Sequence, residues 1–114
     1  MTSNGNEDVY AAIYDMVRLI PKGRVTSYGA IAAAIGMKSG ARMVGYAMLH
    51  CAHVKPRIPA HRVVNSQGLL TGKHHFGNNN EMQRLLEKEG IKVAGDKVTD
   101  FNRLFWDPAK EISL

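Results

Sequence analysis

Two short apolar segments joined by a glycine-containing turn constrain the fold of this chain most. Residues 26–36, "TSYGAIAAAIG", predict a short helix, with Thr26 or Ser27 as its N-terminal cap and Gly36 at its end. Residues 38–51, "KSGARMVGYAMLHC", follow after a brief turn and predict a second helix. Two helices joined in this way are typical of the helix-turn-helix motif, whose second helix faces DNA, although many unrelated helical pairs share the pattern.

A further helix and a polar tail are expected before this motif. Residues 7–20, "EDVYAAIYDMVRLI", place apolar side chains at helical spacing. Residues 1–7 are polar, and we expect a flexible N-terminus there, ahead of a single domain over residues 8–114. A chain of 114 residues is long enough for one hydrophobic core and too short for two.

Valines, turn residues and glycines follow the helical pair. Over residues 62–77 they indicate a short hairpin or wing. A further helix is expected next, capped by Asn79 or Asn80 and ended by Gly90, and then a terminal hairpin around residues 95–96. The sequence therefore predicts a mainly α fold, a winged helix-turn-helix domain.

The charge balance favours a polyanionic partner. Fifteen Lys and Arg against ten Asp and Glu give a net charge of +5 and a pI near 9.6. Nucleic acid is the default partner of so small a basic domain, although many basic proteins bind none. The sequence has no signal-like apolar region and no run approaching about 18 apolar residues. We therefore expect no membrane association, and a cytoplasmic or, in a eukaryote, nuclear location rather than secretion.

The second helix of the pair has two different faces. One is an apolar stripe of Val44, Ala47, Met48 and Cys51, which is expected to face the core. Cys51 is therefore interpreted as a buried small hydrophobe rather than a nucleophile.

The opposite face of this helix carries residues suited to a DNA partner. The small residues Ala41 and Gly45 would let the backbone approach a DNA strand, although easier helix packing explains Gly45 equally well. Arg42 is a solvated charge in the general case and a DNA contact on a basic helix-turn-helix face. Tyr28, in the first turn of the preceding helix, is by itself more often a packing residue.

The histidines form no recognisable catalytic or metal-binding set. A general base needs a reacting partner within hydrogen-bond reach, and the sequence around His61 contains no Ser or Cys. His74 and His75 are adjacent, but paired histidines indicate a metal only when further ligands converge. Together with Lys73 they are interpreted as a solvated basic wing, and neither a metal nor a cofactor is expected. Trp106 is interpreted as a packing residue that holds the C-terminal tail.

Four segments, in this order and spacing, resemble the DNA-binding domain of the 6-O-alkylguanine-DNA alkyltransferases. They are "IPKGRVTSYGAIAAAIG", "GARMVGYAMLH", "IPAHRVVNSQGLLTG" and "LLEKEG", and the resemblance runs from about Val9 to Ile91. In the enzymes the cysteine of "PCHRV" takes the alkyl group from a flipped guanine in a single turnover, and here that position is Ala60. The separate N-terminal domain of many of the enzymes is also missing. Both departures point to the alkyltransferase-like proteins, which bind alkylated DNA without repairing it and pass the lesion to nucleotide excision repair.

The resemblance implies roles for individual residues. Tyr28 matches the tyrosine that helps to rotate the damaged nucleotide out of the stack, and Arg42 matches the arginine that fills the gap. His61 and Glu89 match the pair that activates the thiol through a water. Without a thiol they form a vestigial site that we expect to survive as a structural hydrogen bond. The residues expected to contact DNA are Tyr28, Ala41, Arg42, Gly45 and Lys73.

The resemblance also implies a lesion pocket. Val63 lies where a backbone carbonyl accepts a hydrogen bond from the flipped guanine, and Ala52 replaces a usual asparagine. Lys73 stands where the human-type enzymes have tyrosine. A cation there, with open space at Ala60, would suit a sensor of varied adducts. The expected pocket residues are Tyr28, Pro59, Ala60, Val63, Lys73 and His74.

Two other functions remain open from the sequence. Residual alkyl transfer or hydrolysis would use Cys51 or His61, and it is disfavoured by the apolar stripe and by the lack of a nucleophile near His61. A sequence-specific winged-helix regulator would carry long polar side chains along the second helix, where this chain has small and apolar ones. We expect a monomeric, non-enzymatic sensor of alkylated guanine in double-stranded DNA that works with nucleotide excision repair proteins.

Overall fold

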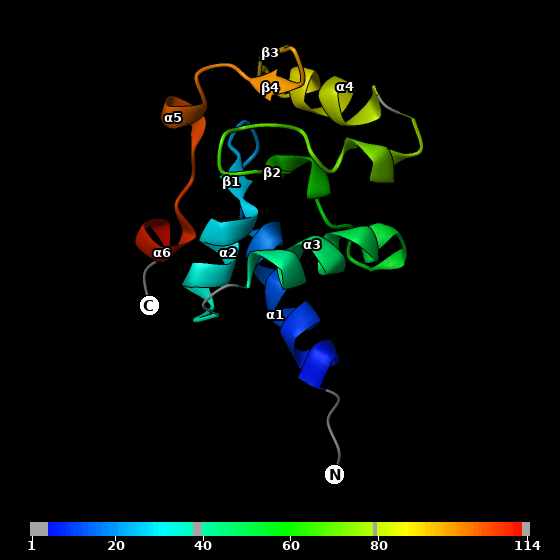
Figure 1. Cartoon of the computed structure of the whole chain (residues 1–114), viewed down its shortest axis with the longest axis vertical. Coiled ribbons are helices and arrows are strands. Elements are labelled where there is room, and N and C mark those ends of the chain that lie inside the picture. Colours follow the sequence, from blue (N-terminus) through cyan, green and yellow to red (C-terminus); the bar gives the residue numbers. More distant parts are fainter. Residues whose placement is uncertain (1–4, 38–39, 79, 113–114) are drawn as a thin grey trace.

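The expected helical pair is present and packs on an N-terminal helix (Figure 1). The computed structural model describes residues 5–37, 40–78 and 80–112. Helix α1 (Gly5–Arg18) contacts α2 (Tyr28–Ala34) and α3 (Ala41–Leu49). Because α1 begins at Gly5, residues 5–7, which the sequence assigned to the flexible N-terminus, are helical, and residues 1–4 lie outside the described residues.

The ends of α2 follow the expected chemistry. The Ser27 hydroxyl accepts a hydrogen bond from the Ala30 N–H at 3.1 Å, so Ser27 is the cap and Thr26 is not. Gly36, just after the helix, has a φ of +80°, a conformation that costs a residue with a side chain about 1 kcal/mol or more. Both the start and the end of α2 are therefore confirmed.

Helix α3 ends earlier than predicted. The three stripe residues inside it, Val44, Ala47 and Met48, are buried, as expected. The chain leaves the α conformation at His50, whose N–H bonds to the Ala47 carbonyl in a tighter turn. Cys51 therefore begins a separate turn, η1 (Cys51–His53), and is only half-buried. Its placement in the helix was wrong, although it packs against the same core cluster as the stripe residues, as predicted.

The segment after α3 forms a strand that pairs with residues just before α2, rather than a hairpin within itself. Strand β1 (Thr26–Ser27) lies parallel to β2 (Val63–Val64), with Thr26 opposite Val63. Both valines of β2 are 1% exposed or less, so they need a partner strand inside the core and cannot form a solvated wing. The hairpin predicted over residues 62–77 was therefore wrong in its pairing. After β2, the Asn65 side chain closes a tight turn by accepting hydrogen bonds from two backbone N–H groups.

The second half of the chain agrees more closely with the structure predicted from the sequence. Helix α4 (Glu81–Lys88) is preceded by Asn80, whose side chain makes no capping bond, and Asn79 lies outside the described residues. Gly90, with a φ of +86°, follows the helix as expected. Strands β3 (Val93–Ala94) and β4 (Lys97–Val98) form the predicted hairpin, whose turn has positive φ at both central residues.

The C-terminal tail packs against α2 and the segment before β1. Helices α5 (Phe101–Leu104) and α6 (Pro108–Glu111) flank Trp106, which is buried and donates its backbone N–H to the Val25 carbonyl at 2.7 Å. The Arg24 guanidinium bonds to two further carbonyls of the tail. The packing function predicted for Trp106 is confirmed.

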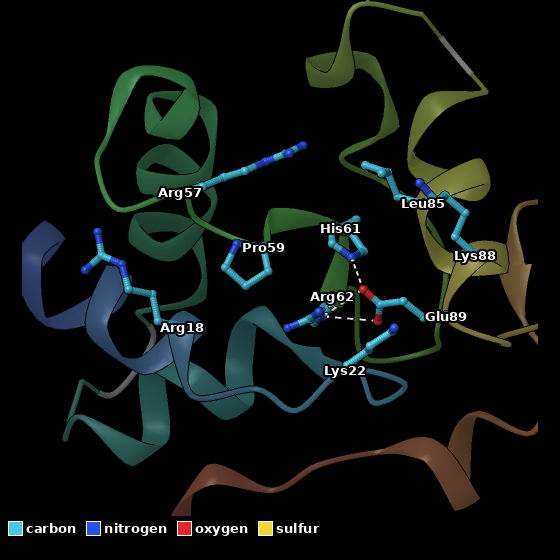
Figure 2. Close-up of a pocket in the computed structure, with 9 residues that line it drawn as sticks. All are labelled: Arg18, Lys22, Arg57, Pro59, His61, Arg62, Leu85, Lys88 and Glu89. Atoms are coloured by element: carbon cyan, nitrogen blue, oxygen red, sulfur yellow. Dashed lines mark hydrogen bonds and ion pairs between the residues drawn. The ribbon is translucent and has the colours of Figure 1, made fainter.

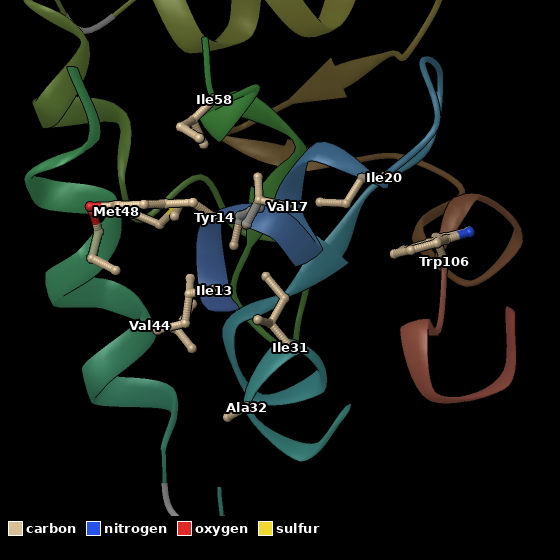
Figure 3. Close-up of a cluster of buried hydrophobic side chains, with 12 residues drawn as sticks. Ile13, Tyr14, Val17, Ile20, Ile31, Ala32, Val44, Met48, Ile58 and Trp106 are labelled. Carbon is tan, nitrogen blue, oxygen red and sulfur yellow. The ribbon is translucent and has the colours of Figure 1, made fainter. Parts of the chain in front are cut away.

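Two hydrophobic clusters hold these elements together. One joins α1, α2, α3 and Trp106, and Figure 3 shows their apolar side chains converging. The other joins β2, α4 and the β3–β4 hairpin through residues such as Val64, Leu86 and Val98. Ala60 itself packs against the first of these clusters. In the part of the chain that the structure describes, every helix is too short or too polar to cross a membrane.

Candidate functional site

Ala60 is the first residue of a short turn that is anchored at both ends. The turn, η2 (Ala60–Arg62), begins after Pro59 and runs directly into β2. Ile58 before it and Val63 after it are buried, at 6% and 1% exposure. The Ala60 N–H bonds to the Ile58 carbonyl at 2.8 Å. Residue 60 is thus held in a fixed place and left half-buried.

The Ala60 methyl group lines a hollow of about 220 Å³, which we call the Ala60 hollow. Polar and apolar surface contribute about equally to its walls, and the polar side chains include those from the segment before Pro59 and from η3 (Lys73–Phe76). Such a space suits a small apolar group that arrives with a polar base. The lining residues are Met48, Leu49, Cys51, Ala52, Arg57, Ile58, Ala60, His75 and Phe76.

A second hollow, of about 490 Å³, adjoins the first along α3. This α3 hollow shares Leu49 and His75 with the Ala60 hollow, so the two are direct neighbours. Four residues that the sequence assigned to DNA contact therefore lie around one surface. The lining residues are Tyr28, Ala41, Arg42, Gly45, Tyr46, Leu49, Thr71, Gly72 and His75.

Tyr28 is fixed in the wall of the α3 hollow. Burial raises the pKa of its phenol, and a hydrogen bond with Thr71 partly opposes this, so the hydroxyl stays protonated at neutral pH. A Cβ at Gly72 would lie 2.9 Å from the Tyr28 hydroxyl oxygen, so a side chain at residue 72 would displace the ring. A proton donor is thus held between α2 and the loop before η3.

Gly45 and Arg42 face outward from α3. A Cβ at Gly45 would meet no atom within 4 Å among the described residues, so helix packing does not require the glycine. Arg42 and Ala41 are exposed beside it. Of the two interpretations of Gly45, close approach by an external partner is the one compatible with this open surface.

The expected pocket residues after β2 are arranged differently from the resemblance. The Lys73 ammonium lies 2.6 Å from the Asp96 carboxylate in the turn of the β3–β4 hairpin. Of the three residues Lys73, His74 and His75, it is His75 that lines both hollows, and neither of the other two lines either one. Pro59 lines a different hollow, and the Val63 side chain is buried in β2.

The vestigial pair is a hydrogen bond, as expected, and it belongs to a larger network (Figure 2). His61 Nε2 lies 2.6 Å from Glu89 Oε2. The Arg62 guanidinium also donates to the Glu89 carboxylate, at 2.8–3.1 Å, and to the Ile20 carbonyl. The Gly23 N–H completes the set at 2.9 Å. Glu89 therefore ties the end of α4 to η2 and to the loop after α1.

The charges in this network follow from burial and pairing. Burial alone would raise the pKa of Glu89, but hydrogen bonds from Arg62, Gly23 and His61 lower it to about 2. Burial lowers the pKa of His61 and outweighs the opposing effect of the Glu89 hydrogen bond. His61 is therefore neutral at pH 7. Because Glu89 is a carboxylate, Nε2 must carry the His61 proton and donate it.

Cys51 shares the Ala60 hollow but is poorly suited to react. Burial raises the pKa of its thiol, which keeps the group protonated at neutral pH. His61, the base in the same turn as Ala60, lines a different hollow from Cys51. Within the described part of the chain, no three His, Cys, Asp or Glu side chains lie close enough together to hold a metal ion.

Comparison with known proteins places this geometry in a family. The domain described as 6-O-methylguanine DNA methyltransferase, DNA binding domain, matches residues 8–91. Alkyltransferase-like protein 1 of Schizosaccharomyces pombe is 35% identical over 106 residues, which cover 90% of this chain and 97% of that protein. The DNA base-flipping protein of Vibrio parahaemolyticus is 35% identical over 97 residues, covering 84% and 93%.

A solved structure agrees with the sequence matches. The crystal structure of S. pombe Atl1 in complex with damaged DNA containing O6-carboxymethylguanine superposes with a TM-score of 0.78 and 34% identity, covering 93% of this chain and 98% of that one. The fold expected from the sequence is therefore confirmed. The chain belongs to the family of the 6-O-methylguanine DNA methyltransferase DNA-binding domain, in its alkyltransferase-like branch.

Proposed function

We propose that this protein binds double-stranded DNA at a 6-O-alkylated guanine, holds the damaged nucleotide flipped out of the helix and leaves the alkyl group in place. The observation that carries this proposal is Ala60. The anchored turn and the His61–Glu89 hydrogen bond are present, but the residue at the centre ends in a methyl group, which cannot accept an alkyl cation.

The relatives support the DNA partner and the flipping step. S. pombe Atl1 was crystallised with damaged DNA containing O6-carboxymethylguanine, and the V. parahaemolyticus relative is called a DNA base-flipping protein. In this chain, Arg42 and Tyr28 lie on one hollow beside the open surface at Gly45. The net charge of +5 supplies the sequence-independent attraction needed to scan DNA.

The energetics of flipping favour a damaged base. Extruding a nucleotide costs on the order of a few kcal/mol, and less when the base is poorly paired. An alkyl group on the guanine oxygen disrupts Watson–Crick pairing, so the damaged guanine is the cheaper base to extrude. The planar Arg42 guanidinium can then lie against the neighbouring bases and offset their lost stacking. The flipped base enters by the α3 hollow, and its alkyl group reaches the Ala60 hollow.

The alternative of alkyl transfer by Cys51 is chemically weaker. A thiol attacks as the thiolate, and burial disfavours the thiolate of Cys51. The neutral His61 ring is held by Glu89 and faces the other side of the turn. We infer that neither residue forms the nucleophile and base pair that such a transfer needs.

A protein that binds a lesion without removing it needs a second activity to follow. We propose that the complex marks the lesion for nucleotide excision repair. A reconstituted incision assay on a duplex with one 6-O-methylguanine should run faster with this protein than without it. An unchanged incision rate would instead favour a protective function at the lesion.

Mass spectrometry tests the non-enzymatic character directly. The protein is incubated in excess with a duplex that contains one 6-O-methylguanine, and both are then weighed. The adduct should remain on the DNA and the protein mass should stay constant. Cys51→Ser is the matched variant, because an alkylated wild type with an unmodified Cys51→Ser would assign transfer to Cys51 and overturn the proposal.

A further inference from the structure

A strongly basic hollow of about 480 Å³ lies on the other side of the Ala60 turn (Figure 2). Cations reach it from the end of α1, from the loop after α1, from the segment before Pro59, from η2 and from α4. Glu89 is the one carboxylate among the described residues that line it. The full lining is Arg18, Lys22, Arg57, Pro59, His61, Arg62, Leu85, Lys88 and Glu89.

Two of the five cations already have partners. Arg62 is bound to Glu89, and Arg18 pairs with Asp15 and bonds to the Pro56 carbonyl. The Glu89 carboxylate, which is the negative charge among the described lining residues, is therefore already paired within the protein. What remains is a surplus of positive charge that needs a partner from outside.

The other three cations have no close partner among the described residues. Lys22, Arg57 and Lys88 are exposed, and the structure gives them no hydrogen bond or ion pair with any described residue. In Figure 2, Arg57 and Lys88 reach toward each other from opposite walls, with Lys22 below them. Three unpaired cations that converge on one concavity form a ready site for carboxylate groups.

The basic hollow is separate from the surface proposed to hold DNA. Among its described lining residues, none is shared with the α3 hollow, and Arg57 alone is shared with the Ala60 hollow. Ala60 lines one side of the turn and His61, the next residue, lines the other. A duplex seated on α3 therefore leaves this side of the turn accessible to a second partner.

We propose that the basic hollow binds an acidic peptide segment of a partner protein. Its recessed shape and the apolar Pro59 and Leu85 in its lining suit side chains that project from a peptide, whereas a duplex offers a convex row of phosphates. The binding itself does not depend on a lesion. Only the assignment of the partner to repair rests on the proposed function.

Fluorescence anisotropy with a labelled acidic peptide, EDELEDELED, tests the site on the intact protein. The triple variant Lys22→Gln, Arg57→Gln, Lys88→Gln should bind the peptide about tenfold more weakly, because it removes three charge-assisted contacts. The matched control is Lys92→Gln, Lys97→Gln, Lys110→Gln, which removes the same charge from exposed positions outside the hollow. The control should stay within about twofold of the wild type, since exposed distant charges are screened by salt.

A DNA arm separates this inference from the lesion-binding proposal. The double variant Lys22→Gln, Lys88→Gln, which leaves Arg57 of the Ala60 hollow in place, should keep the wild-type preference for a 6-O-methylguanine duplex. Undamaged duplex should not displace the peptide. Equal loss of peptide binding in both triple variants, or no peptide binding by the wild type, would overturn the inference. Displacement of the peptide by duplex would make the hollow a DNA site and overturn it as well. If Arg42→Ala loses lesion binding but keeps peptide binding, the result supports the separation of the two sites and bears on the proposed function alone.

Discussion

His61 Nε2 donates a hydrogen bond to Glu89 Oε2 across 2.6 Å, although no thiol stands at residue 60 for the pair to activate. Glu89 is also held by the Arg62 guanidinium and the Gly23 N–H. These bonds join α4, η2 and the loop after α1. The pair therefore has a structural function that is independent of any chemistry at residue 60, and this function explains its presence in a site without a nucleophile.

Removing Arg62 should destabilise the fold. Arg62→Met leaves the Glu89 carboxylate, which is 8% exposed, without its double partner. Breaking a buried ion pair usually lowers the free energy of unfolding by about 3–5 kcal/mol. We expect a decrease at the lower end of this range, because His61 and Gly23 still hydrogen-bond to the carboxylate. Denaturant unfolding measures the change. The control Arg84→Met breaks an exposed pair of similar length and should leave stability unchanged. Equal losses in the two variants would contradict the account.

Stability should fall with acidification in two ranges. The pKa of His61 lies below its ordinary 6.5 in the fold, so the unfolded chain takes up the proton first and stability declines as pH drops below about 6.5. The pKa of Glu89 is about 2 against an ordinary 4.5, so its contribution is present above about pH 4.5 and is lost as pH falls toward 2. Thermal unfolding from pH 2 to 8 shows both ranges. Glu89→Gln should make stability less dependent on pH in the lower range. An unchanged dependence there would contradict the hydrogen-bond network proposed around Glu89.

Tyr28 and Arg42 should matter for DNA and little for the fold. Arg42 is exposed, so Arg42→Ala should keep the wild-type circular dichroism and weaken binding to a damaged duplex. If Arg42 contacts a phosphate, the slope of log affinity against log salt should become shallower by about 0.9 in Arg42→Ala.

Tyr28→Ala should lose about 1–3 kcal/mol of binding free energy, the usual value of an aromatic contact with a base. The control Arg103→Ala removes a charge that is 71% exposed on α5. Wild-type affinity in both site variants would mean that the α3 hollow is not the lesion site.

How much of the fold could be predicted depends on how local each signal is. Ser27 and Gly36 bound α2, and the Gly95–Asp96 turn forms the hairpin, because these features depend on a few neighbouring residues. The parallel pairing of β1 with β2 joins distant segments and leaves no local pattern. The early end of α3 was also missed, because its apolar spacing continues to Cys51 although the helix does not.

The site residues also divide into those that could be predicted from the sequence and those that could not. Tyr28, Arg42 and Ala60 were assigned through the family resemblance, and the structure adds that they line two neighbouring hollows. His75 was interpreted as part of a solvated basic wing, because the sequence cannot tell which of two adjacent histidines in a 3₁₀ turn faces a hollow. Arg57 was missed because its cationic neighbours come from α1 and α4, far away in the chain.

Filling the Ala60 hollow should change the preference for adduct size. Larger alkyl groups gain burial at roughly 25 cal/mol per Å², so the wild type should lose little affinity from methyl to ethyl to benzyl adducts. Ala60→Leu occupies part of the 220 Å³ and should penalise the benzyl adduct more than methyl, by about 1–3 kcal/mol of overpacking. Titrations of the three duplexes with both proteins measure it. Equal weakening of all three, or none, would show that residue 60 does not line the adduct pocket.

The most direct test of the central claim compares one duplex with and without a single 6-O-methylguanine. Both are titrated with wild-type protein at the same salt concentration, because the electrostatic attraction to DNA is common to them. The lesion makes flipping cheaper, so the damaged duplex should bind more tightly and should be recovered afterwards with its methyl group in place. Equal affinity for the two duplexes, or recovery of unmodified guanine, would contradict recognition without repair.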